Sequence, residues 1–213
     1  MGRRKKEPES VHRENISAAA ERLFREKGIE AATMDDIARE AGYSKATLYV
    51  YFENKEELIG FLVLKSMKLL YGCLHEAVEQ GTTVRETYDR ICCALTRYQE
   101  NYPLYFAFAL GEIQVSADAQ EERSVERETY ETGELINVEI ARFIRGGIKE
   151  GEFQPDIPIL PTTFLFWAAL AGVIQMAGNK QGYMEQSLDL SKQQFLEFGF
   201  DRLYRMIAVE GRS

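Results

Sequence analysis

Apolar residues recur every three or four positions along nearly the whole chain, and this period constrains the fold more than any other feature. Between residues 12 and 27, for example, one face of the pattern holds Ile16, Ala19, Ala20, Leu23 and Phe24. This spacing is typical of an amphipathic α-helix, whereas a half-buried strand would alternate every second residue. Glycines separate the periodic stretches, as they do at helix ends. The sequence therefore predicts an all-α fold.

The chain length and the cysteines limit the class of protein. A chain of 213 residues can form one large domain, or a small domain joined to a larger one, without metal or disulfide staples. The three cysteines, Cys73, Cys92 and Cys93, are odd in number and two are adjacent, so they predict thiols in a reducing cytoplasm. The basic run near the start has no apolar stretch behind it, so no signal peptide is expected. We therefore expect a cytoplasmic protein.

One long apolar segment could be read in two ways. Residues 157–179 contain no charged residue and are about as long as a membrane span. However, Pro158 and Pro161 lie in its first third, and only Asp156 and Lys180 flank it, so no polybasic flank fixes an orientation. We expect a helix buried on all sides, in a core or a subunit interface, and no membrane partner.

The charge is distributed unevenly along the chain. Residues 1–55 contain 11 Lys and Arg against 10 Asp and Glu, whereas residues 56–213 contain 15 against 24. This difference would be explained if the chain had a small N-terminal unit that tolerates an anionic partner and a larger acidic unit that does not. The sequence therefore predicts one domain over residues 1–55 and a second over residues 56–213.

Two short helices separated by a tight turn are predicted near the N-terminus. Thr33 is a good N-cap for the helix MDDIAREA, Gly42 stops that helix, and Ser44 can cap the next one. Such a pair is a helix-turn-helix, and the amphipathic helix before it gives the pair a surface on which to pack.

The second short helix has two different sides. If Leu48 and Phe52 face inward, then Lys45, Thr47 and Tyr49 project from an exposed helix. An exposed helix of this kind can enter the major groove of DNA and contact bases and phosphates. A surface helix in a protein that never meets DNA can carry the same residue types, so the geometry alone leaves both alternatives open.

The same segment resembles a known family. Residues 33–58, TMDDIAREAGYSKATLYVYFENKEEL, are similar to the signature of the TetR family of bacterial transcriptional regulators. The resemblance extends from residue 12 to about residue 62. It departs at Tyr43, Ala46 and Val50, where valine, glycine and histidine are frequent, and the change at Val50 removes one possible phosphate donor.

The resemblance implies a set of DNA contacts. Thr33 would cap the second helix near a phosphate, the segment 44–47 would open the recognition helix toward the bases, and Lys55 with two tyrosines would grip the backbone. The full expected set is Thr33, Tyr43, Ser44, Lys45, Ala46, Thr47, Tyr49, Tyr51 and Lys55. The basic arm Arg3, Arg4, Lys5 and Lys6 either reaches an adjacent groove or is a solvated tail.

The acidic half contains candidate ligand residues but no dense motif. Residues 102–110, YPLYFAFAL, hold four aromatic side chains, which form either a crowded core or the wall of a ligand cavity. The residues expected around an unidentified small-molecule effector are Tyr102, Tyr105, Phe106, Phe108, Glu112 and Trp167. Residues 118–134 are strongly acidic and are expected to be a solvated helix face or a mobile connection.

Two final helices are predicted over about Leu160–Gly178 and Ser191–Val209. The first is too apolar for one neighbour to cover, so a second copy of the chain is the simplest partner. The resemblance implies that both helices and their symmetry mates form a four-helix dimer interface. The candidate interface residues are Phe164, Trp167, Ala168, Ala171, Phe195 and Phe198.

Taken with the resemblance, these features predict a DNA-binding transcriptional regulator. We expect a repressor that binds a palindromic operator as a homodimer and is released by a small-molecule effector. The alternatives are an activator of the same fold, or a helical protein-interaction module that does not bind DNA. We expect no enzyme, metal or cofactor, because only His12 and His75 are present and no catalytic motif appears.

Overall fold

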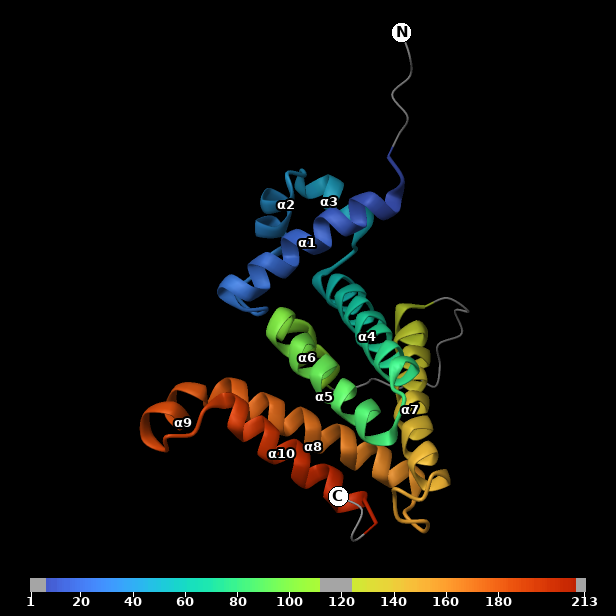
Figure 1. Cartoon of the computed structure of the whole chain (residues 1–213). Coiled ribbons are helices and arrows are strands. Elements are labelled where there is room, and N and C mark those ends of the chain that lie inside the picture. Colours follow the sequence, from blue (N-terminus) through green and yellow to red (C-terminus); the bar gives the residue numbers. More distant parts are fainter. Residues whose placement is uncertain (1–6, 112–123, 210–213) are drawn as a thin grey trace.

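The computed structural model describes residues 7–111 and 124–209, and the regular elements in these ranges are α-helices (Figure 1). They are α1 (Glu9–Lys27), α2 (Met34–Ala41), α3 (Lys45–Tyr51), α4 (Lys55–Gln80), α5 (Val84–Asn101), α6 (Pro103–Ala109), α7 (Val125–Lys149), α8 (Ile159–Asn179), α9 (Gln181–Ser187) and α10 (Lys192–Ile207). Phe153 and Ala208 add one isolated antiparallel bridge. The predicted all-α fold is confirmed.

Side-chain caps explain where many of these helices begin. In six helices the oxygen of the N-cap residue accepts a hydrogen bond from the backbone N–H three residues further on, which satisfies one of the free donors of the first turn. These caps are Thr33, Ser44, Asn54, Thr83, Ser124 and Ser191. The helix starts predicted at Thr33 and Ser44 are therefore confirmed.

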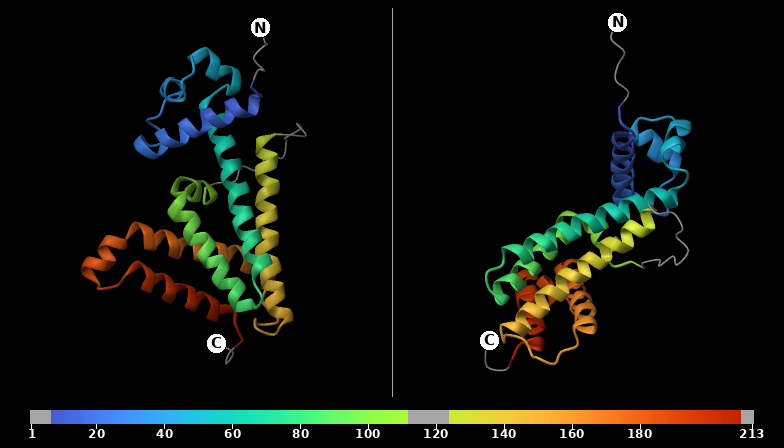
Figure 2. Two further views of the ribbon diagram at one scale, coloured as in Figure 1. Left: turned by 45° about the horizontal axis from the view of Figure 1, so that its top comes forward. Right: turned by 90° about the vertical axis from the view of Figure 1, so that its right-hand side faces the viewer.

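The molecule consists of a small head and a larger body. The head contains α1, α2 and α3, and α4 leads from the head into the body, where it lies beside α7 and α5 (Figures 1 and 2). Because α4 begins at Lys55 and runs into the body without a break, the division of the chain at residue 55 stays a prediction.

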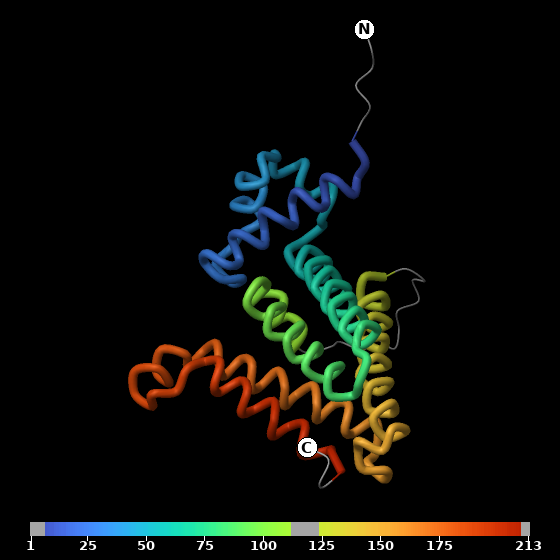
Figure 3. The backbone as a smooth tube through the Cα atoms, viewed as in Figure 1, coloured from blue at the N-terminus to red at the C-terminus, as the bar shows by residue number. Residues whose placement is uncertain are grey.

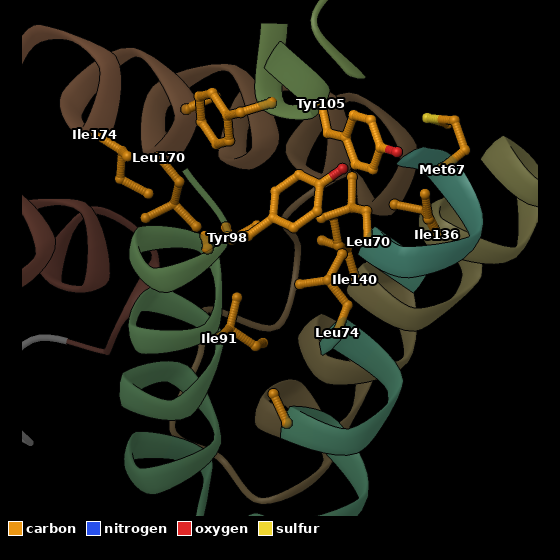
Figure 4. Packing of buried hydrophobic residues seen from close by; sticks show 14 of the residues in the cluster. Met67, Leu70, Leu74, Ile91, Tyr98, Tyr105, Ile136, Ile140, Leu170 and Ile174 are labelled. Atoms are coloured by element: carbon orange, nitrogen blue, oxygen red, sulfur yellow. The ribbon is translucent and has the colours of Figure 1, made fainter. Parts of the chain in front are cut away.

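Interlocking side chains from four helices fill the body. Figure 4 shows Leu70 of α4, Ile91 of α5, Ile140 of α7 and Leu170 of α8 pointing toward a common core, and all four are buried. Tyr98 lies among them, and its hydroxyl donates to the carbonyl of Ser66 at 2.9 Å. A buried tyrosine hydroxyl needs such a partner, so this hydrogen bond fixes α5 against α4.

Two polar contacts join the head to the body. The hydroxyl of Tyr105 on α6 donates to a carboxylate oxygen of Glu21 on α1 at 2.9 Å. Lys65 on α4 lies 2.5 Å from Glu14 on α1. Both contacts place the underside of α1 against the top of the body, so the angle of the head depends on α4 and α6.

The last helices form a pair that projects from the rest of the body. α8 and α10 pack side by side, and α9 joins them at their outer end (Figure 3). Neither α6 nor α9 was predicted as a separate helix. Helix α7 starts at Val125, so the described part of the acidic segment 118–134 is helical, which is one of the two structures expected for it, and residues 118–123 lie outside the described residues.

A single protomer buries only one side of the helix after residue 157, so the expectation that a core or a subunit interface buries it on all sides stays a prediction. Phe166, Leu170 and Ile174 of α8 lie in the core. Leu160 and Phe164, on another face, are 65% and 60% exposed. The difference arises because α5, α7 and α10 cover only one side of α8.

Two helices, α4 and α8, are long and apolar enough to cross a membrane if length and composition alone are considered. Only the second of these was noticed in the sequence. Core helices of globular proteins meet the same criteria, and both helices contribute residues to the core described above. The finding is therefore weak evidence for a membrane span.

Adjacent glycines near the end of α7 provide a test of the core packing. A methyl group on Gly147 would lie 2.2 Å from a ring carbon of the buried Phe153. A methyl group on Gly146 would have no neighbouring atom within 4 Å. We expect Gly147→Ala to destabilise the protein by about 1–3 kcal/mol through overpacking. Gly146→Ala, the matched control, should stabilise it by up to ~1 kcal/mol. Urea unfolding followed by circular dichroism measures both; equal effects would show that the ring does not press on α7.

Candidate DNA-binding surface

The first helix of the helix-turn-helix, α2, is fixed at its start by a reciprocal cap. The Thr33 hydroxyl oxygen accepts from the backbone N–H of Asp36 at 3.2 Å, and the Asp36 carboxylate accepts from the backbone N–H of Thr33 at 3.3 Å. Lys27 of α1 donates to the same carboxylate at 2.5 Å. The hydrogen bond from Lys27, followed by those from Thr33, holds the pKa of Asp36 far below its usual range. Thr33 is exposed beside this cap, as expected.

The turn between α2 and α3 requires a glycine. Gly42 ends α2 with φ of 75°, a left-handed conformation that glycine adopts without steric cost. The next backbone N–H, that of Tyr43, bonds to the carbonyl of Ala38 at 2.9 Å, which closes the end of the helix. The chain then enters α3 through the Ser44 cap, whose oxygen accepts from the N–H of Thr47 at 3.1 Å.

α3 is anchored by one side and exposed on the other. Leu48 and Phe52 are fully buried in the head. Lys45 and Tyr49 are exposed, as the sequence predicts, whereas Thr47, which was expected to project with them, is half-buried. Ala46 is exposed as well. Because α3 has only seven residues, these two anchors determine the direction in which its outer face points.

The exposed lysine of α3 already has a partner. The Lys45 ammonium lies 2.7 Å from a carboxylate oxygen of Asp35 on α2, and both side chains are exposed. This hydrogen bond raises the pKa of Lys45. An ion pair between two exposed side chains is weak, so a DNA phosphate or base can replace Asp35. The Thr47 hydroxyl is also engaged, at 2.7 Å from the Ser44 hydroxyl.

The two remaining tyrosines of the expected set belong to an aromatic cluster with α1. The Tyr43 hydroxyl lies 2.7 Å from Nδ1 of His12, and the Tyr51 ring stacks on the His12 ring at a centroid distance of 4.9 Å. Both tyrosines are half-buried. The sequence interpretation considered His12 only as a possible catalytic residue, so its role in holding these tyrosines was missed.

Lys55 is the first residue of α4 and is half-buried. Its ammonium donates to the carbonyl of Glu30 at 3.4 Å, which is a long hydrogen bond that leaves donors available. The structure therefore places Lys55 and α3 in the same head, on separate elements.

Arg13 is a structural residue of this surface that the sequence interpretation did not identify. Its guanidinium donates to the carbonyl of Tyr51 at 2.6 Å and to Glu57 at 3.0 Å. It also lies 4.2 Å from the centre of the Phe52 ring. Arg13 thus ties the end of α3 to the start of α4. Its position in the sequence could have indicated this role, because Arg13 lies three residues before Ile16, on the face of α1 that otherwise carries small or apolar side chains.

Among the described residues, the side chains expected around a ligand are divided between two grooves and the core. Phe108 lines a groove of about 870 Å³ between the head and the body, and Tyr102 lines a separate groove of about 280 Å³ between α4 and α5. Tyr105 and Phe106 are instead buried in the core, because α6 turns their rings inward, and Trp167 of α8 is half-buried and lines neither groove. Glu112 lies outside the described residues.

The expected interface residues lie mostly on the outside of the α8–α10 pair. Phe164 and Ala168 of α8 and Phe198 of α10 are exposed. Trp167 and Phe195 are half-buried. Ala171 requires a correction: it is buried within the protomer, because it lies on the side of α8 that faces the core. The basic arm, Arg3, Arg4, Lys5 and Lys6, lies outside the described residues.

Together, the capped α2, the glycine turn and the anchored α3 form a helix-turn-helix, the motif of one large class of DNA-binding proteins. Residues 16–60 match the model of a family described as bacterial regulatory proteins, tetR family. The chain belongs to the TetR family of bacterial transcriptional regulators.

Similar proteins agree with this assignment. The chain is 28% identical to the uncharacterized HTH-type transcriptional regulator YfiR of Bacillus subtilis, over 87% of this chain and 88% of the relative. It is 29% identical to the HTH-type transcriptional repressor KstR2 of Rhodococcus jostii, over 70% of this chain and 72% of that protein. The protein is therefore a transcriptional regulator and not an enzyme.

Solved structures share the whole fold. The ketosteroid transcriptional regulator KstR2 of Mycobacterium tuberculosis superposes with a TM-score of 0.67 at 20% identity, covering 93% of this chain and 95% of that chain. SmeT, solved as a complex with triclosan, superposes with a TM-score of 0.65 at 20% identity, covering 94% of this chain and 93% of the SmeT chain. At these identities the likeness shows the fold, a helix-turn-helix head on a helical body.

Proposed function

We propose that this regulator is a cytoplasmic repressor that binds a palindromic operator as a homodimer and leaves it when a small molecule binds. One observation supports the dimer most directly. Leu160, Phe164, Ala168, Gly172 and Met176 are spaced four residues apart on α8, and all five are exposed. Rows at this spacing form the ridges by which helices pack, so a second protomer can cover this face.

Two heads on one dimer would explain how a short helix gains useful specificity. A single α3 reaches only a few base pairs, whereas two copies related by a two-fold axis read half-sites about 34–36 Å apart. The exposed Phe198 lies on α10, which packs beside α8, so both helices can take part in the interface.

The names of the relatives favour repression and a small-molecule effector. KstR2 is named a repressor and, in its structure, a ketosteroid regulator, and SmeT was solved with triclosan. An activator would use the same head, so the DNA surface does not distinguish the two modes. A protein-interaction module without DNA binding has no support among these relatives.

DNA binding by the head can be tested with two classes of substitution. Tyr49→Phe and Lys55→Ala should weaken binding to every duplex sequence, because they remove phosphate donors, and Lys55→Ala should reduce the salt slope by about 1. Substitutions at Lys45 or Thr47 should instead change the preferred sequence, because these residues lie on the exposed start of α3. Fluorescence anisotropy with the duplex upstream of the protein's own gene, at several salt concentrations, measures both effects.

The matched control is Lys149→Ala, which removes one positive charge at the end of α7, remote from the head. It should leave both the affinity and the salt slope unchanged. If the Tyr49→Phe, Lys55→Ala double variant bound the operator as tightly as the original protein at all salt concentrations, the DNA-binding assignment of these residues would be wrong.

A further inference from the structure

The groove of about 870 Å³ lies at the junction of the head and the body. The end of α3, the start of α4, the end of α6 and the start of α7 form its walls. Its lining includes the apolar side chains of Ile59, Val63, Met67, Phe108 and Val125. This volume and lining are within the usual range for small-molecule sites.

The polar lining of the groove is predominantly acidic. Four carboxylates line it, on Glu53, Glu56, Glu57 and Glu126, against the single cation of Arg13. Arg13 is already engaged with Glu57 at 3.0 Å. Among the described residues, the side chains of the other three glutamates have no hydrogen-bond or ion-pair partner. As far as the described residues go, the groove thus combines an apolar interior with negative charge that no neighbouring cation balances.

We propose that this groove binds an amphiphilic organic cation and that its binding lowers the affinity for the operator. The proposal rests on the function proposed above, a regulator that responds to a small molecule, and it assigns the site and the charge of that molecule. An apolar body would displace water from the side chains of α4 and α6. A cationic group would lie near Glu56 of α4 and Glu126 of α7, which both line the groove, whereas an anion of equal size would be repelled.

The position of the groove explains how a ligand would affect DNA binding. Tyr51 and Val50, the last residues of α3, belong to its lining, as do Arg13 and Glu57. Arg13 holds the end of α3 through the carbonyl of Tyr51 and through Glu57. Because Glu57 lines the same groove as Glu56 and Glu126, a cation held by those two carboxylates would also attract the Glu57 carboxylate, in competition with Arg13, and would weaken the tie that sets the direction of α3. A ligand shifts the operator equilibrium only through such a difference in affinity between two states.

Two probes of the same shape and opposite charge test the assignment. Tetraphenylphosphonium and tetraphenylborate would be titrated separately into the full-length protein by isothermal titration calorimetry. We expect the cation to bind and the anion not to bind. Glu56→Gln and Glu126→Gln should each weaken cation binding about threefold, and together roughly tenfold, because each removes one exposed charge partner. Glu150→Gln, which removes one carboxylate from the far end of α7, is the matched control and should have no effect.

A steric variant tests the location without changing the charge. A side chain at Gly60 would point toward Val125 across the groove, since a methyl group there lies 3.6 Å from a Val125 methyl carbon. Gly60→Leu should therefore abolish cation binding. Equal binding of both probes, or cation binding that the Gln variants and Gly60→Leu leave unchanged, would overturn the proposal.

The DNA readout separates this inference from the proposed function. With an operator duplex obtained by selection from random sequences, saturating tetraphenylphosphonium should weaken binding of the original protein at least about fivefold and leave the Gly60→Leu protein unaffected. Operator binding that the cation does not weaken would overturn the inference and leave the DNA-binding function intact. Failure to bind any duplex would instead refute the proposed function, while the calorimetric test of the groove would still apply.

Discussion

A glutamate in place of Ala168 is expected to make the protein monomeric and to remove operator binding. Ala168 lies at the middle of the exposed row on α8, so a second protomer would bury a carboxylate there, close to its symmetry mate. Burying a charge without a partner costs several kcal/mol, which is more than most dimer interfaces tolerate at one position. A monomer presents one α3, and the affinity for the operator should fall at least about 100-fold.

Light scattering after gel filtration measures the first effect, and the expected mass of the variant is that of one chain, 24.4 kDa. The control is Val138→Glu, which places the same charge on an exposed apolar position of α7. This control should remain dimeric and bind DNA normally. A dimeric Ala168→Glu protein with an unchanged circular dichroism spectrum and normal operator affinity would show that this face of α8 is not the interface.

Truncating Leu48 to alanine is expected to destabilise the head. Leu48 is fully buried and, with Phe52, is one of two anchors of a helix of seven residues. Removing a buried leucine side chain costs about 2–5 kcal/mol, because it loses hydrophobic burial and leaves a cavity. The free energy of unfolding of a whole protein domain is only about 5–15 kcal/mol. We therefore expect α3 to lose its fixed direction and operator binding to fall strongly at 25 °C.

Urea unfolding and hydrogen exchange of the head amides measure the loss of stability. Val50→Ala is the matched control, because Val50 is an apolar residue of the same helix that is 75% exposed. It should change the free energy of unfolding by less than about 0.5 kcal/mol. If both variants had the same stability, Leu48 would not be the anchor described above.

Local signals in the sequence were sufficient to predict the geometry of the helix-turn-helix, whereas its DNA contacts stay a prediction. The caps at Thr33 and Ser44 and the glycine at position 42 act over three or four residues, so their effect can be inferred without knowing the tertiary structure. The alternation of Leu48 with Lys45 and Tyr49 likewise gives the two sides of α3 directly. These features were predicted correctly because each depends on neighbours in the chain.

The grooves and the coupling contacts could not be predicted in the same way. Whether Tyr105 lines a cavity or fills the core depends on how α6 is rotated against α1 and α4, and residues far apart in the sequence decide this. Arg13 reaches Tyr51 and Glu57 across separate helices, 38 and 44 positions away. The acidic lining of the groove also depends on tertiary packing, because Glu126 and Glu56 line the same groove only when α7 packs on α4.

The ion pair between Lys45 and Asp35 has a consequence for the search for an operator. A lysine that is free in solution gains its full attraction to any phosphate, whatever the base sequence. Lys45 must first give up a carboxylate, so Asp35 acts as an internal competitor and reduces the attraction to random DNA. Only a DNA site that offers the Lys45 ammonium a well-placed acceptor compensates for the lost interaction with Asp35. We therefore expect the pair to shorten the residence of the regulator on incorrect sequences, which far outnumber the correct one in a genome.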